Sequence, residues 1–500
     1  MQKNIPRVCL TLTSPTLSEN VSLVKKYSAY IDLVELRVDY LNESEQNFVR
    51  RFPAMIPFPC ILTIRRKNDG GNFFGNEMSR TILFSRALAF ANQDRKKNFA
   101  YVDFEEEYQV PSLQEAALSF GTKIIRSVHD MKNPIKNLQA RFSDMHAKPN
   151  EILKIACMPH TLSDITEMFA EAKTLHGFDY ILCAMGNLGI PSRILAQKTN
   201  SFLTYTSPKE TEENLSSVRH LDPETLETVF HFKSLNDETK IFAVTGFPLT
   251  KTSNPFLHNE LYKRHKKNAI MIPLASTSIE ESLAFANELG ISGMAITVPY
   301  KEKVLPYVQN VSDEVKKIEA TNTIVKTDAG FFAYNTDAFG FEKALLEFLQ
   351  TNNLRKTRIA IIGAGGAAKA VAFVIKKLHG NACIFNRTLS KAQELAKKYR
   401  FHFAELSPAS LETLQKFSDV IIQTTNVGMN ANTESNEETD PIYFYNFRGT
   451  EKIFDLIYTP DKTALMKKAE NAGCKISNGF TMLRYQAEKQ AELFQGIKNE

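Results

Sequence analysis

Short runs of apolar and β-branched residues recur through the first half of the sequence, at intervals of roughly 20 to 35 residues. Eight such runs occur, at residues 7–13, 31–38, 60–65, 99–104, 123–128, 152–158, 180–185 and 202–206. Segments between them show helical spacing of apolar residues, at 80–92, 113–120, 135–146 and 161–176. Apolar strands that alternate with helices indicate a parallel sheet covered on both faces. Eight units predict a closed (β/α)8 TIM barrel, although an open doubly wound sheet would give a similar pattern.

Composition excludes several classes of protein. Of the 500 residues, 43% are hydrophobic and 23% charged, as in ordinary globular proteins. No apolar run reaches the roughly 18 residues that a membrane-spanning helix needs. The net charge of +5 is small for this length, which argues against a nucleic-acid partner and fits anionic small-molecule substrates.

Cysteine and histidine usage indicates the compartment and the metal content. The six cysteines show no CxxC spacing, and the histidines show no zinc pattern. The first 12 residues also lack the build of a signal or transit peptide. We therefore expect a cytoplasmic protein that holds no metal.

Polar residues stand at the predicted strand ends, where a barrel carries its chemistry. Glu35 and Arg37 end the second run, Arg65 the third and His129 the fifth, and Arg193 follows the seventh.

Lys154 lies inside the sixth run, between apolar neighbours. Burial disfavours the charged form of a lysine, and a neutral amine can form a Schiff base with a ketone. The alternative is a lysine whose amine extends to the rim of the sheet.

Five segments resemble type I 3-dehydroquinate dehydratase, and they occur in that family's order: VELRVD (34–39), TIRRKNDGG (63–71), SVHD (127–130), LKIACMP (153–159) and MGNLGIPSR (185–193). The resemblance implies a barrel that removes water from 3-dehydroquinate through a Schiff base on Lys154. It also implies that His129 moves the protons and that Arg193 clamps the substrate carboxylate. Glu35, Arg37 and Arg65 would hold the ring hydroxyls.

Two positions depart from that family's pattern. The family orients its histidine with a glutamate, where this chain has Asp69. The family closes its site with a Ser-x-Pro-Gly-Gln segment. Here Ser216 matches the serine, and His220 stands at the glutamine position.

A polar stretch at 233–239 follows a predicted helix at 224–232, and a new strand begins at 241. We therefore predict a barrel domain at 1–232, a linker at 233–239 and a second α/β region from 240.

A glycine-rich turn gives the clearest motif of the second half. The apolar strand 358–362 leads into a helical run that extends to Leu378, through Gly363, Ala364, Gly365, Gly366 and Ala367. Such a turn lets the backbone approach a pyrophosphate at a helix N-terminus. The next strand ends in Asn386, Arg387 and Thr388, where an NAD site carries a carboxylate. Arg387 favours the 2′-phosphate of NADP, unless it is only a solvated residue beside a glycine turn.

Segments along residues 241–497 resemble shikimate dehydrogenase: GFPLTKTSNPFLHN (246–259), GMAITVPYKE (293–302), ATNTIV (320–325), YNTDAFG (334–340), TTNVGM (424–429), DLIYTPDKTAL (455–465) and NGFTMLRYQA (478–487). The resemblance implies a two-lobed α/β unit. Its substrate lobe would span 240–337 and include a C-terminal helix at 479–497. An NADP-binding Rossmann-like lobe would span 338–478.

The same resemblance implies residue roles. Lys301 and Asp337 would form the catalytic pair, although such a pair is more often an ordinary surface salt bridge. Thr252 and Asn254 replace the two serines that hold the carboxylate in that family. The other implied contacts are hydroxyl binding by Thr297, Asn322 and Gln486, carboxylate binding by Tyr458, and cofactor binding by Thr425 and Gly479.

The two resemblances describe consecutive steps, because the implied product of the barrel, 3-dehydroshikimate, is the implied substrate of the dehydrogenase. We therefore predict a bifunctional enzyme of chorismate and aromatic amino acid biosynthesis. It would act on small carboxylates as a monomer or homodimer. The alternatives are a dehydrogenase with an inactive barrel, and an NADP-binding regulator without turnover.

Overall fold

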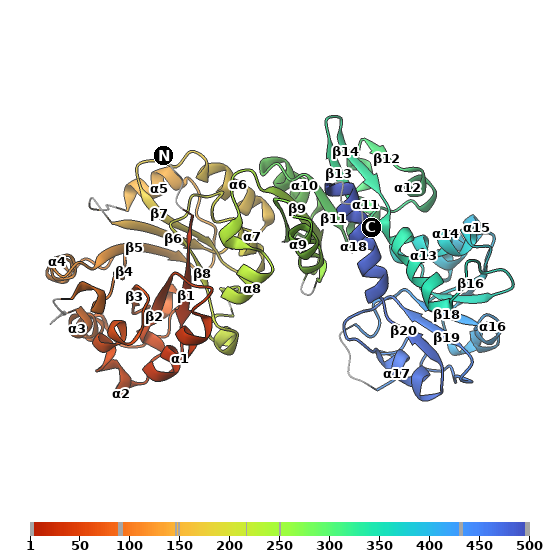
Figure 1. The fold of residues 1–500 in the computed structure, drawn as a ribbon, viewed down its shortest axis with the longest axis horizontal. Coiled ribbons are helices and arrows are strands. Elements are labelled where there is room, and N and C mark those ends of the chain that lie inside the picture. The colour runs from red at the N-terminus through yellow and green to blue at the C-terminus, as the bar shows by residue number, and fades with distance from the viewer. Residues whose placement is uncertain are drawn as a thin grey trace. The chain divides into compact units, whose positions relative to one another are not determined.

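A computed structural model of the chain describes residues 5–88, 94–145, 148, 151–216, 218–249, 252–429 and 434–495. The chain divides into two compact units. One comprises Met1–Asn259 with Asn268–Ile291, and the other comprises Glu260–Lys267 with Ser292–Glu500. Figure 1 labels the helices and strands of both units, and each unit is described by itself.

The first unit contains eight parallel strands in the order β7-β6-β5-β4-β3-β2-β1-β8 (Figure 1). They are β1 (Arg7–Leu12), β2 (Leu33–Arg37), β3 (Cys60–Thr63), β4 (Tyr101–Glu105), β5 (Lys123–Asp130), β6 (Ile152–Cys157), β7 (Asp179–Ala184) and β8 (Leu203–Thr206). Strand β1 pairs with both β2 and β8, and the Phe202 amide donates to the Tyr180 carbonyl at 2.7 Å between β7 and β8. The sheet is therefore a nearly closed barrel, which confirms the predicted architecture.

Helices connect the strands of the barrel. They are α1 (Leu17–Tyr27), α2 (Glu43–Gln46), α3 (Glu77–Leu88), α4 (Pro111–Ser119), α5 (Leu138–Asp144), α6 (Leu162–Ala172), α7 (Ile190–Ile194) and α8 (Pro223–Thr228). Local sequence sets their ends: Thr16 caps α1, and Thr161 forms a capping box with Asp164 at α6. The predicted helices match α3 to α6 with shifted ends. Residues 89–92 and 146 of those predictions lie outside the described residues.

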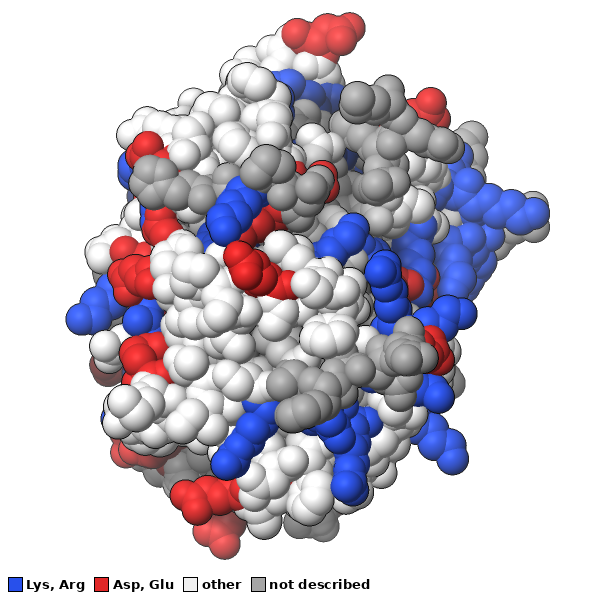
Figure 2. Space-filling view, turned by 90° about the vertical axis from the view of Figure 1, so that its left-hand side faces the viewer, with Lys and Arg blue, Asp and Glu red and all other residues white. Residues whose placement is uncertain are grey.

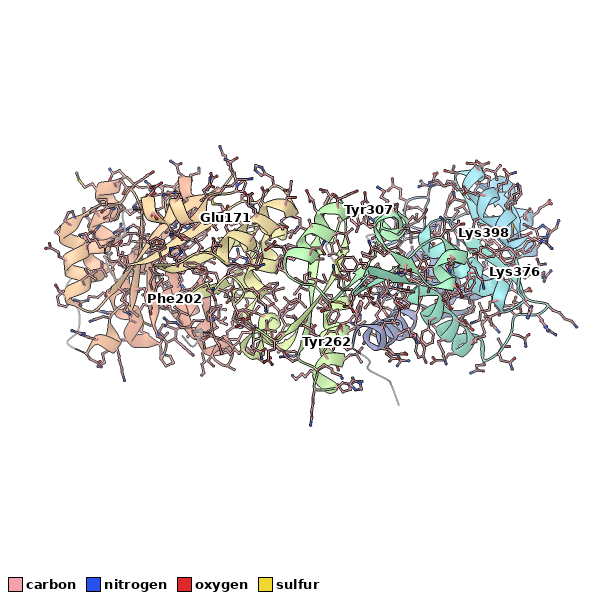
Figure 3. The ribbon with its side chains drawn as sticks, turned by 90° about the horizontal axis from the view of Figure 1, so that it is seen from above. Glu171, Phe202, Tyr262, Tyr307, Lys376 and Lys398 are labelled. Atoms are coloured by element: carbon pink, nitrogen blue, oxygen red, sulfur yellow. The ribbon has the colours of Figure 1, made fainter. Side chains whose placement is uncertain are left out.

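One layer of the barrel interior is apolar. Strand residues such as Cys9, Leu33, Ile61 and Ile125 form a buried cluster, against which Phe202 packs (labelled in Figure 3). The Arg7 guanidinium lies 4.2 Å from the Phe202 ring. Because this layer is filled with side chains, chemistry is confined to the polar layer at the carboxyl ends of the strands.

The first unit also holds the beginning of the second α/β region. Strands β9 (Lys240–Gly246) and β10 (Ala269–Ala275) pair in parallel. Helix α10 (Ile279–Glu288) packs on α6, where the rings of Phe169 and Phe285 are 5.8 Å apart.

On the face drawn in Figure 2, basic and acidic side chains are interspersed over much of the surface.

The second unit has two sheets. In the first, β11 (Gly293–Ile296) and β14 (Gly330–Tyr334) are antiparallel to β13 (Thr323–Thr327), and β12 (Asn310–Val311) is parallel to β14. The helices associated with this sheet are α11 (Tyr300–Lys303), α12 (Asp313–Ile318), α13 (Thr336–Leu349) and the C-terminal α18 (Phe480–Gln495). Helix α9 (Asn254–Arg264) precedes β10 in the chain.

The second sheet is parallel, with the order β17-β16-β15-β18-β19-β20. Its strands are β15 (Arg358–Ile362), β16 (Asn381–Asn386), β17 (His402–Glu405), β18 (Val420–Gln423), β19 (Lys452–Asp455) and β20 (Lys475–Ser477). Its helices are α14 (Gly366–Lys377), α15 (Leu389–Tyr399), α16 (Leu411–Lys416) and α17 (Ala464–Asn471). This Rossmann-like arrangement confirms the predicted fold class of the region.

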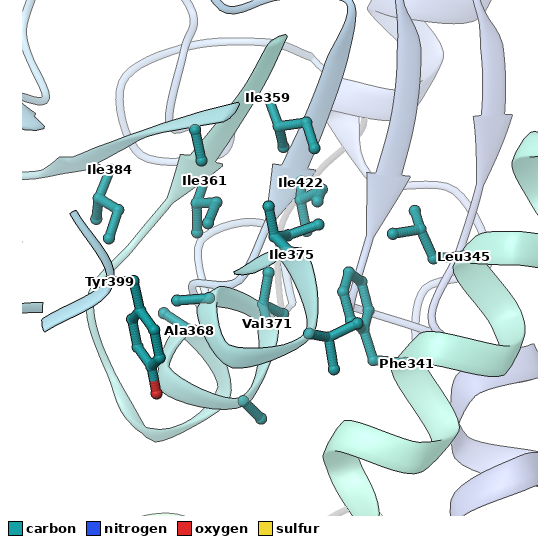
Figure 4. Packing of buried hydrophobic residues seen from close by; sticks show 14 of the residues in the cluster. Phe341, Leu345, Ile359, Ile361, Ala368, Val371, Ile375, Ile384, Tyr399 and Ile422 are labelled. Atoms are coloured by element: carbon teal, nitrogen blue, oxygen red, sulfur yellow. The ribbon is translucent and has the colours of Figure 1, made fainter. Parts of the chain in front are cut away.

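A buried core fixes the glycine turn in this sheet. Figure 4 shows Ile359 and Ile361 of β15 packing with Val371 and Ile375 of α14, while Phe341 of α13 joins the same cluster. Because both elements that flank the turn are anchored in one core, the turn between them is held in place.

Candidate active sites

A small cavity opens at the carboxyl ends of the barrel strands. Its walls include all but one of the barrel residues singled out in the sequence: Glu35, Arg37, Arg65, Asp69, His129, Lys154, Arg193 and His220. Ser216 is the exception, since it is exposed and ends a 3-10 turn. The free volume is about 60 Å³, with Leu215, Val218 and His220 forming part of the wall.

Lys154 points into this cavity and is 5% exposed. Its Nζ lies 2.9 Å from Asp103 Oδ2 and 3.9 Å from Glu35 Oε1. Nζ is also 4.4 Å from the centre of the Tyr205 ring. The amine is therefore placed inside the barrel, next to two carboxylates, rather than at the rim.

Asp103 connects the cations of the cavity and was not singled out in the sequence. Its other carboxylate oxygen lies 2.8 Å from Arg65 Nη2 and accepts a hydrogen bond from Ser127 Oγ at 2.5 Å. Burial alone would raise the pKa of Asp103, but Arg65 and Lys154 hold it well below its usual value. The available signal was the alternation of Asp103 and Glu105 along an apolar strand, which places both carboxylates on one face.

His129 is the candidate base. Its Nδ1 is buried and has no hydrogen-bond partner among the residues that the structure describes. Burial lowers the pKa of His129 well below its usual value, and the charges of Arg65 and Lys154 lower it further. The imidazole is therefore neutral at neutral pH and able to accept a proton.

Asp69 lines the same cavity as His129 but is held by another residue. Its carboxylate accepts a hydrogen bond from Arg66 Nε at 2.6 Å. Since His129 Nδ1 is unpartnered in the described part of the chain, the expected orienting contact is not made through that atom.

Two arginines that line the cavity differ in their hydrogen bonding. Arg37 donates two hydrogen bonds to Asp39, at 3.0 and 2.7 Å, so its charge is neutralised. Arg193 is 2% exposed, and within the described part of the chain it donates to the Val218 carbonyl alone, at 3.1 Å. Its Nε and Nη1 have no partner within the described residues. A buried guanidinium with free donors is suited to a bidentate carboxylate.

The predicted catalytic pair of the second region lies in the second unit. Lys301 Nζ is ion-paired with Asp337 Oδ2 at 2.5 Å, and Asn322 donates to the other carboxylate oxygen at 2.9 Å. Asp337 is 2% exposed and lies in the first turn of α13, where the helix dipole stabilises a negative charge. The lysine side chain retains 17% exposure, so the pair is not an ordinary surface salt bridge.

The glycine turn fits a dinucleotide. Gly363 has a φ of +111°, and no atom lies within 4 Å of the position that a Cβ on Gly365 would occupy. Gly366 begins α14, and a Cβ there would lie 3.5 Å from side-chain atoms of Lys301. The open backbone and the helix N-terminus therefore face the space beside Lys301, while Ala364 and Ala367 flank these glycines.

Arg387 follows β16 and is exposed. It forms no ion pair with a carboxylate in the described parts of the chain. Asn386 Nδ2 donates to the Thr388 carbonyl at 2.9 Å, which fixes the turn around it. A free guanidinium at this strand end fits the 2′-phosphate of NADP.

The remaining predicted residues of the second region lie as follows. Thr297, Tyr458 and Gln486 are half-buried in the second unit. Thr425 Oγ1 accepts from the Val427 amide at 3.2 Å. A Cβ at Gly479 would lie 2.0 Å from the Leu456 carbonyl oxygen, so packing alone requires glycine there.

Hydrogen bonds also involve Asn254 and Asn322, two of the residues predicted to bind the substrate. In the first unit, Asn254 Nδ2 donates to Thr252 Oγ1 at 3.2 Å. In the second, Gln490 donates to the Asn322 carbonyl and to Thr323 Oγ1, at 3.1 and 2.8 Å. Gln490 was missed in the sequence, although it lies one helical turn after Gln486 on α18.

Neither a spanning helix nor a metal cluster is found in the described residues. None of their helices combines the length and apolarity needed to cross a membrane. Among the same residues, no group of three or more histidine, cysteine, aspartate and glutamate side chains is arranged to hold a metal ion.

Comparison with known proteins identifies three matching families along the chain. A type I 3-dehydroquinase model matches residues 8–237, a shikimate dehydrogenase substrate-binding domain matches 244–324, and a shikimate / quinate 5-dehydrogenase model matches 346–439. A shikimate dehydrogenase (NADP(+)) of Pyrococcus abyssi is 32% identical over 258 residues, covering 52% of this chain and 93% of that protein.

Two relatives extend over nearly the whole chain. One is the chloroplastic bifunctional 3-dehydroquinate dehydratase/shikimate dehydrogenase of Arabidopsis thaliana, which is 26% identical and covers 99% of this chain and 83% of its own length. The other is the shikimate biosynthesis protein AroDE of Chlamydia pneumoniae, which is 27% identical, with 97% and 95% covered.

Proposed function

Since the chain belongs to the shikimate dehydrogenase family and carries a type I 3-dehydroquinase domain ahead of that region, we propose that it catalyses two consecutive reactions of the shikimate pathway. The first removes water from 3-dehydroquinate, and the second reduces the resulting 3-dehydroshikimate with NADPH. We assign the dehydratase to 1–232, the linker to 233–239, the substrate lobe to 240–337 with the C-terminal helix 479–497, and the NADP lobe to 338–478.

The observation that best supports the dehydratase reaction is the buried amine of Lys154. It lies in one cavity with a neutral histidine and an arginine whose donors are unpartnered in the described residues. Lys154 loses a proton and attacks the ring ketone. That proton returns as the adduct expels water, which leaves a protonated imine (iminium). Arg193 holds the substrate carboxylate, and Glu35, Arg37 and Arg65 surround the ring hydroxyls.

His129 moves the protons of the elimination. It takes the proton from the carbon beside the imine, and the electron pair moves onto the iminium nitrogen. The enamine then expels the hydroxyl group, which leaves as water after His129 returns the proton. Hydrolysis of the imine releases 3-dehydroshikimate and restores Lys154. The free volume of the cavity is only about 60 Å³, so we expect side chains of its wall to move when the substrate enters.

The dehydrogenase depends on Lys301 and Asp337. When bound, the nicotinamide supplies the hydride for the ketone carbon. Lys301 gives its proton to the ketone oxygen, while Asp337 keeps the lysine in position and Asn322 fixes Asp337. The turn at Gly363, Gly365 and Gly366 would hold the pyrophosphate, and Arg387 the 2′-phosphate.

Borohydride trapping tests the Schiff base. We expect 3-dehydroquinate and borohydride to add the mass of one reduced adduct to the intact chain, and peptide mapping to place it on Lys154. The variant Lys154→Ala should gain no adduct. An adduct on another residue, or none on the wild-type chain, would contradict the proposed mechanism.

We further propose a role in chorismate and aromatic amino acid biosynthesis and a cytoplasmic location. All six cysteines are buried free thiols, as is usual in reducing compartments. We also propose that the chain acts as a monomer or a homodimer, and light scattering would distinguish the two.

A further inference from the structure

The C-terminal helix α18 makes a polar contact that the reactions described above do not use. Gln490 lies on the buried face of this helix and is 0% exposed. Its side-chain amide donates to the Asn322 carbonyl at 3.1 Å and to Thr323 Oγ1 at 2.8 Å. Since buried amides are retained where they are hydrogen-bonded, these contacts tie the helix to the chain at the start of β13.

From there, hydrogen bonds continue to the carboxylate of the proposed dehydrogenase pair. Thr323 Oγ1 donates to Asn322 Oδ1 at 3.0 Å, and Asn322 Nδ2 donates to Asp337 Oδ1 at 2.9 Å. The other oxygen of Asp337 holds the Lys301 amine. Thr323, Asn322 and Asp337 are each at most 2% exposed. A continuous buried network therefore connects Gln490 to the proton donor, and each bond in it orients the next.

Close packing holds α18 against the elements that carry this network. A Cβ added to Gly340 of α13 would lie 2.6 Å from the Met482 carbonyl oxygen of α18. A Cβ added to Gly293 of β11 would lie 2.7 Å from a ring carbon of Phe494. Figure 1 shows α18 beside α13. Because there is no room for a side chain at either glycine, the helix is docked tightly and the Gln490 amide acts from a fixed position.

We propose that Gln490 is a positioning residue of the dehydrogenase, which fixes Asn322 and through it the carboxylate of Asp337. Gln490 holds the Asn322 backbone directly, at its carbonyl, and holds the side chain through the Thr323 hydroxyl. Lys301 must present its proton to the ketone oxygen as the hydride arrives, so a displaced carboxylate slows the chemical step rather than cofactor binding. This inference rests on the proposed dehydrogenase reaction and adds a supporting residue to it.

The test compares Gln490→Met with Phe494→Leu in the full chain. Methionine keeps the length of the side chain and loses both donors, so the kcat for reduction of 3-dehydroshikimate should fall roughly tenfold, with the KM for NADPH unchanged. Phe494→Leu loosens the same helix without removing a hydrogen bond of the network. It should lower the melting temperature and leave kcat unchanged.

Single-turnover kinetics separates positioning from a loss of folded protein. With the chain in excess over NADPH and with saturating 3-dehydroshikimate, the rate constant of NADPH oxidation reports hydride transfer in the folded molecules. We expect Gln490→Met to lower this rate constant by the same factor as kcat. A variant that had only lost folded molecules would keep the wild-type rate constant, because unfolded chains do not contribute to it.

Thr323→Val is a second variant, so that the test does not depend on the folding of the first. It removes the hydroxyl through which Gln490 reaches the Asn322 side chain, and it should slow hydride transfer by itself. Because both substitutions interrupt one network, the double variant should be slowed by less than the product of the two single effects.

The outcomes separate this inference from the reaction on which it rests. Slower hydride transfer in Gln490→Met and Thr323→Val, but not in Phe494→Leu, supports the inference. It is overturned if hydride transfer is unchanged in Gln490→Met or in Thr323→Val, if Phe494→Leu is slowed equally, or if the two single effects multiply, while the wild-type chain still reduces 3-dehydroshikimate. A wild-type chain that does not oxidise NADPH with 3-dehydroshikimate would overturn the dehydrogenase itself, and the inference with it.

Discussion

Asp103 is the residue on which the charge balance of the barrel cavity depends. It pairs with both Lys154 and Arg65, and all three side chains are buried. Removing one partner of a buried ion pair leaves the other charge uncompensated, which is strongly destabilising. Asp103 therefore holds both cations in the geometry on which the proposed dehydratase mechanism depends.

We expect Asp103→Asn to lower the free energy of unfolding of the barrel by about 3 kcal/mol, because Lys154 and Arg65 lose their carboxylate. Dehydratase activity should fall strongly, and shikimate oxidation should persist. Urea unfolding measures the first effect. Asp130→Asn, at a partly exposed aspartate after His129, is the control. An equal effect of both variants would contradict the role of Asp103.

His129 gives the barrel a dependence on pH. Its pKa is depressed in the folded protein, so the unfolded chain binds more protons once the pH falls below the unfolded value of about 6.5. Its contribution to stability is present above that pH and is lost as the pH falls. The pKa of His220 is also depressed, so its contribution to stability is likewise lost as the pH falls.

We therefore expect the free energy of unfolding to decrease between about pH 7 and pH 5, and His129→Asn to reduce that slope. Urea unfolding at several pH values measures it. A slope identical to that of the wild-type chain would show that His129 is not buried in its neutral form.

Arg387 should decide between the two nicotinamide cofactors. Arg387→Asp replaces the cation with a carboxylate that would repel a 2′-phosphate, so the KM for NADPH should rise far more than that for NADH. Steady-state kinetics with both cofactors is the measurement. Equal changes would show that Arg387 does not contact this phosphate.

At the scale of elements, a helix N-terminus positions Asp337 of the proposed dehydrogenase pair. Asn335 caps α13, whose first turn carries Asp337. The Asn335 side chain accepts from the Ala338 amide at 3.1 Å and donates to the Ala320 carbonyl at 2.8 Å. The cap therefore ties the first turn of α13 to the loop before β13, which holds Asn322.

We expect Asn335→Ala to cost about 1 kcal/mol of stability and to reduce hydride transfer, because the first turn of α13 loosens. Ser312→Ala removes a comparable cap from α12, which carries no catalytic residue, so it should affect stability alone. Thermal unfolding and shikimate oxidation separate the two effects. Equal loss of activity in both variants would exclude a specific role for the α13 cap.

The strands could be predicted more closely than the helices, for a physical reason. A buried parallel strand is a continuous apolar run, so residues 358–362 match β15 at both ends. Helix ends depend on capping, which is why α3 begins at Glu77 rather than at residue 80. The 3-10 turn at Lys209–Leu215, which precedes Ser216, could not be predicted, because its sequence has no periodicity to read.

Site residues that belong to a sequence motif could be predicted, whereas residues that are recognised only by their tertiary contacts could not. Lys154 and Lys301 stand in recognisable segments. Other residues can be recognised only from tertiary contacts, as with Asp103 and Gln490. Tyr205 is recognised from a buried hydroxyl that has no hydrogen-bond partner in the described residues. Sequence spacing does not report such tertiary contacts.

At the scale of the whole molecule, one chain carries two separately built sites. The residues that line the barrel cavity lie within the first unit, and the Lys301–Asp337–Asn322 cluster with the glycine turn lies within the second. Since the sites share none of these residues, each activity should be removable without the other.

Oxidation of NADPH by the purified chain with 3-dehydroquinate as the only other substrate tests the dual activity most directly. The account predicts a steady fall in nicotinamide absorbance, which Lys154→Ala and Lys301→Ala each abolish. It also predicts that adding 3-dehydroshikimate restores the signal in Lys154→Ala alone. A wild-type chain that oxidises NADPH with 3-dehydroshikimate but not with 3-dehydroquinate would show that the barrel is inert, and would contradict the account.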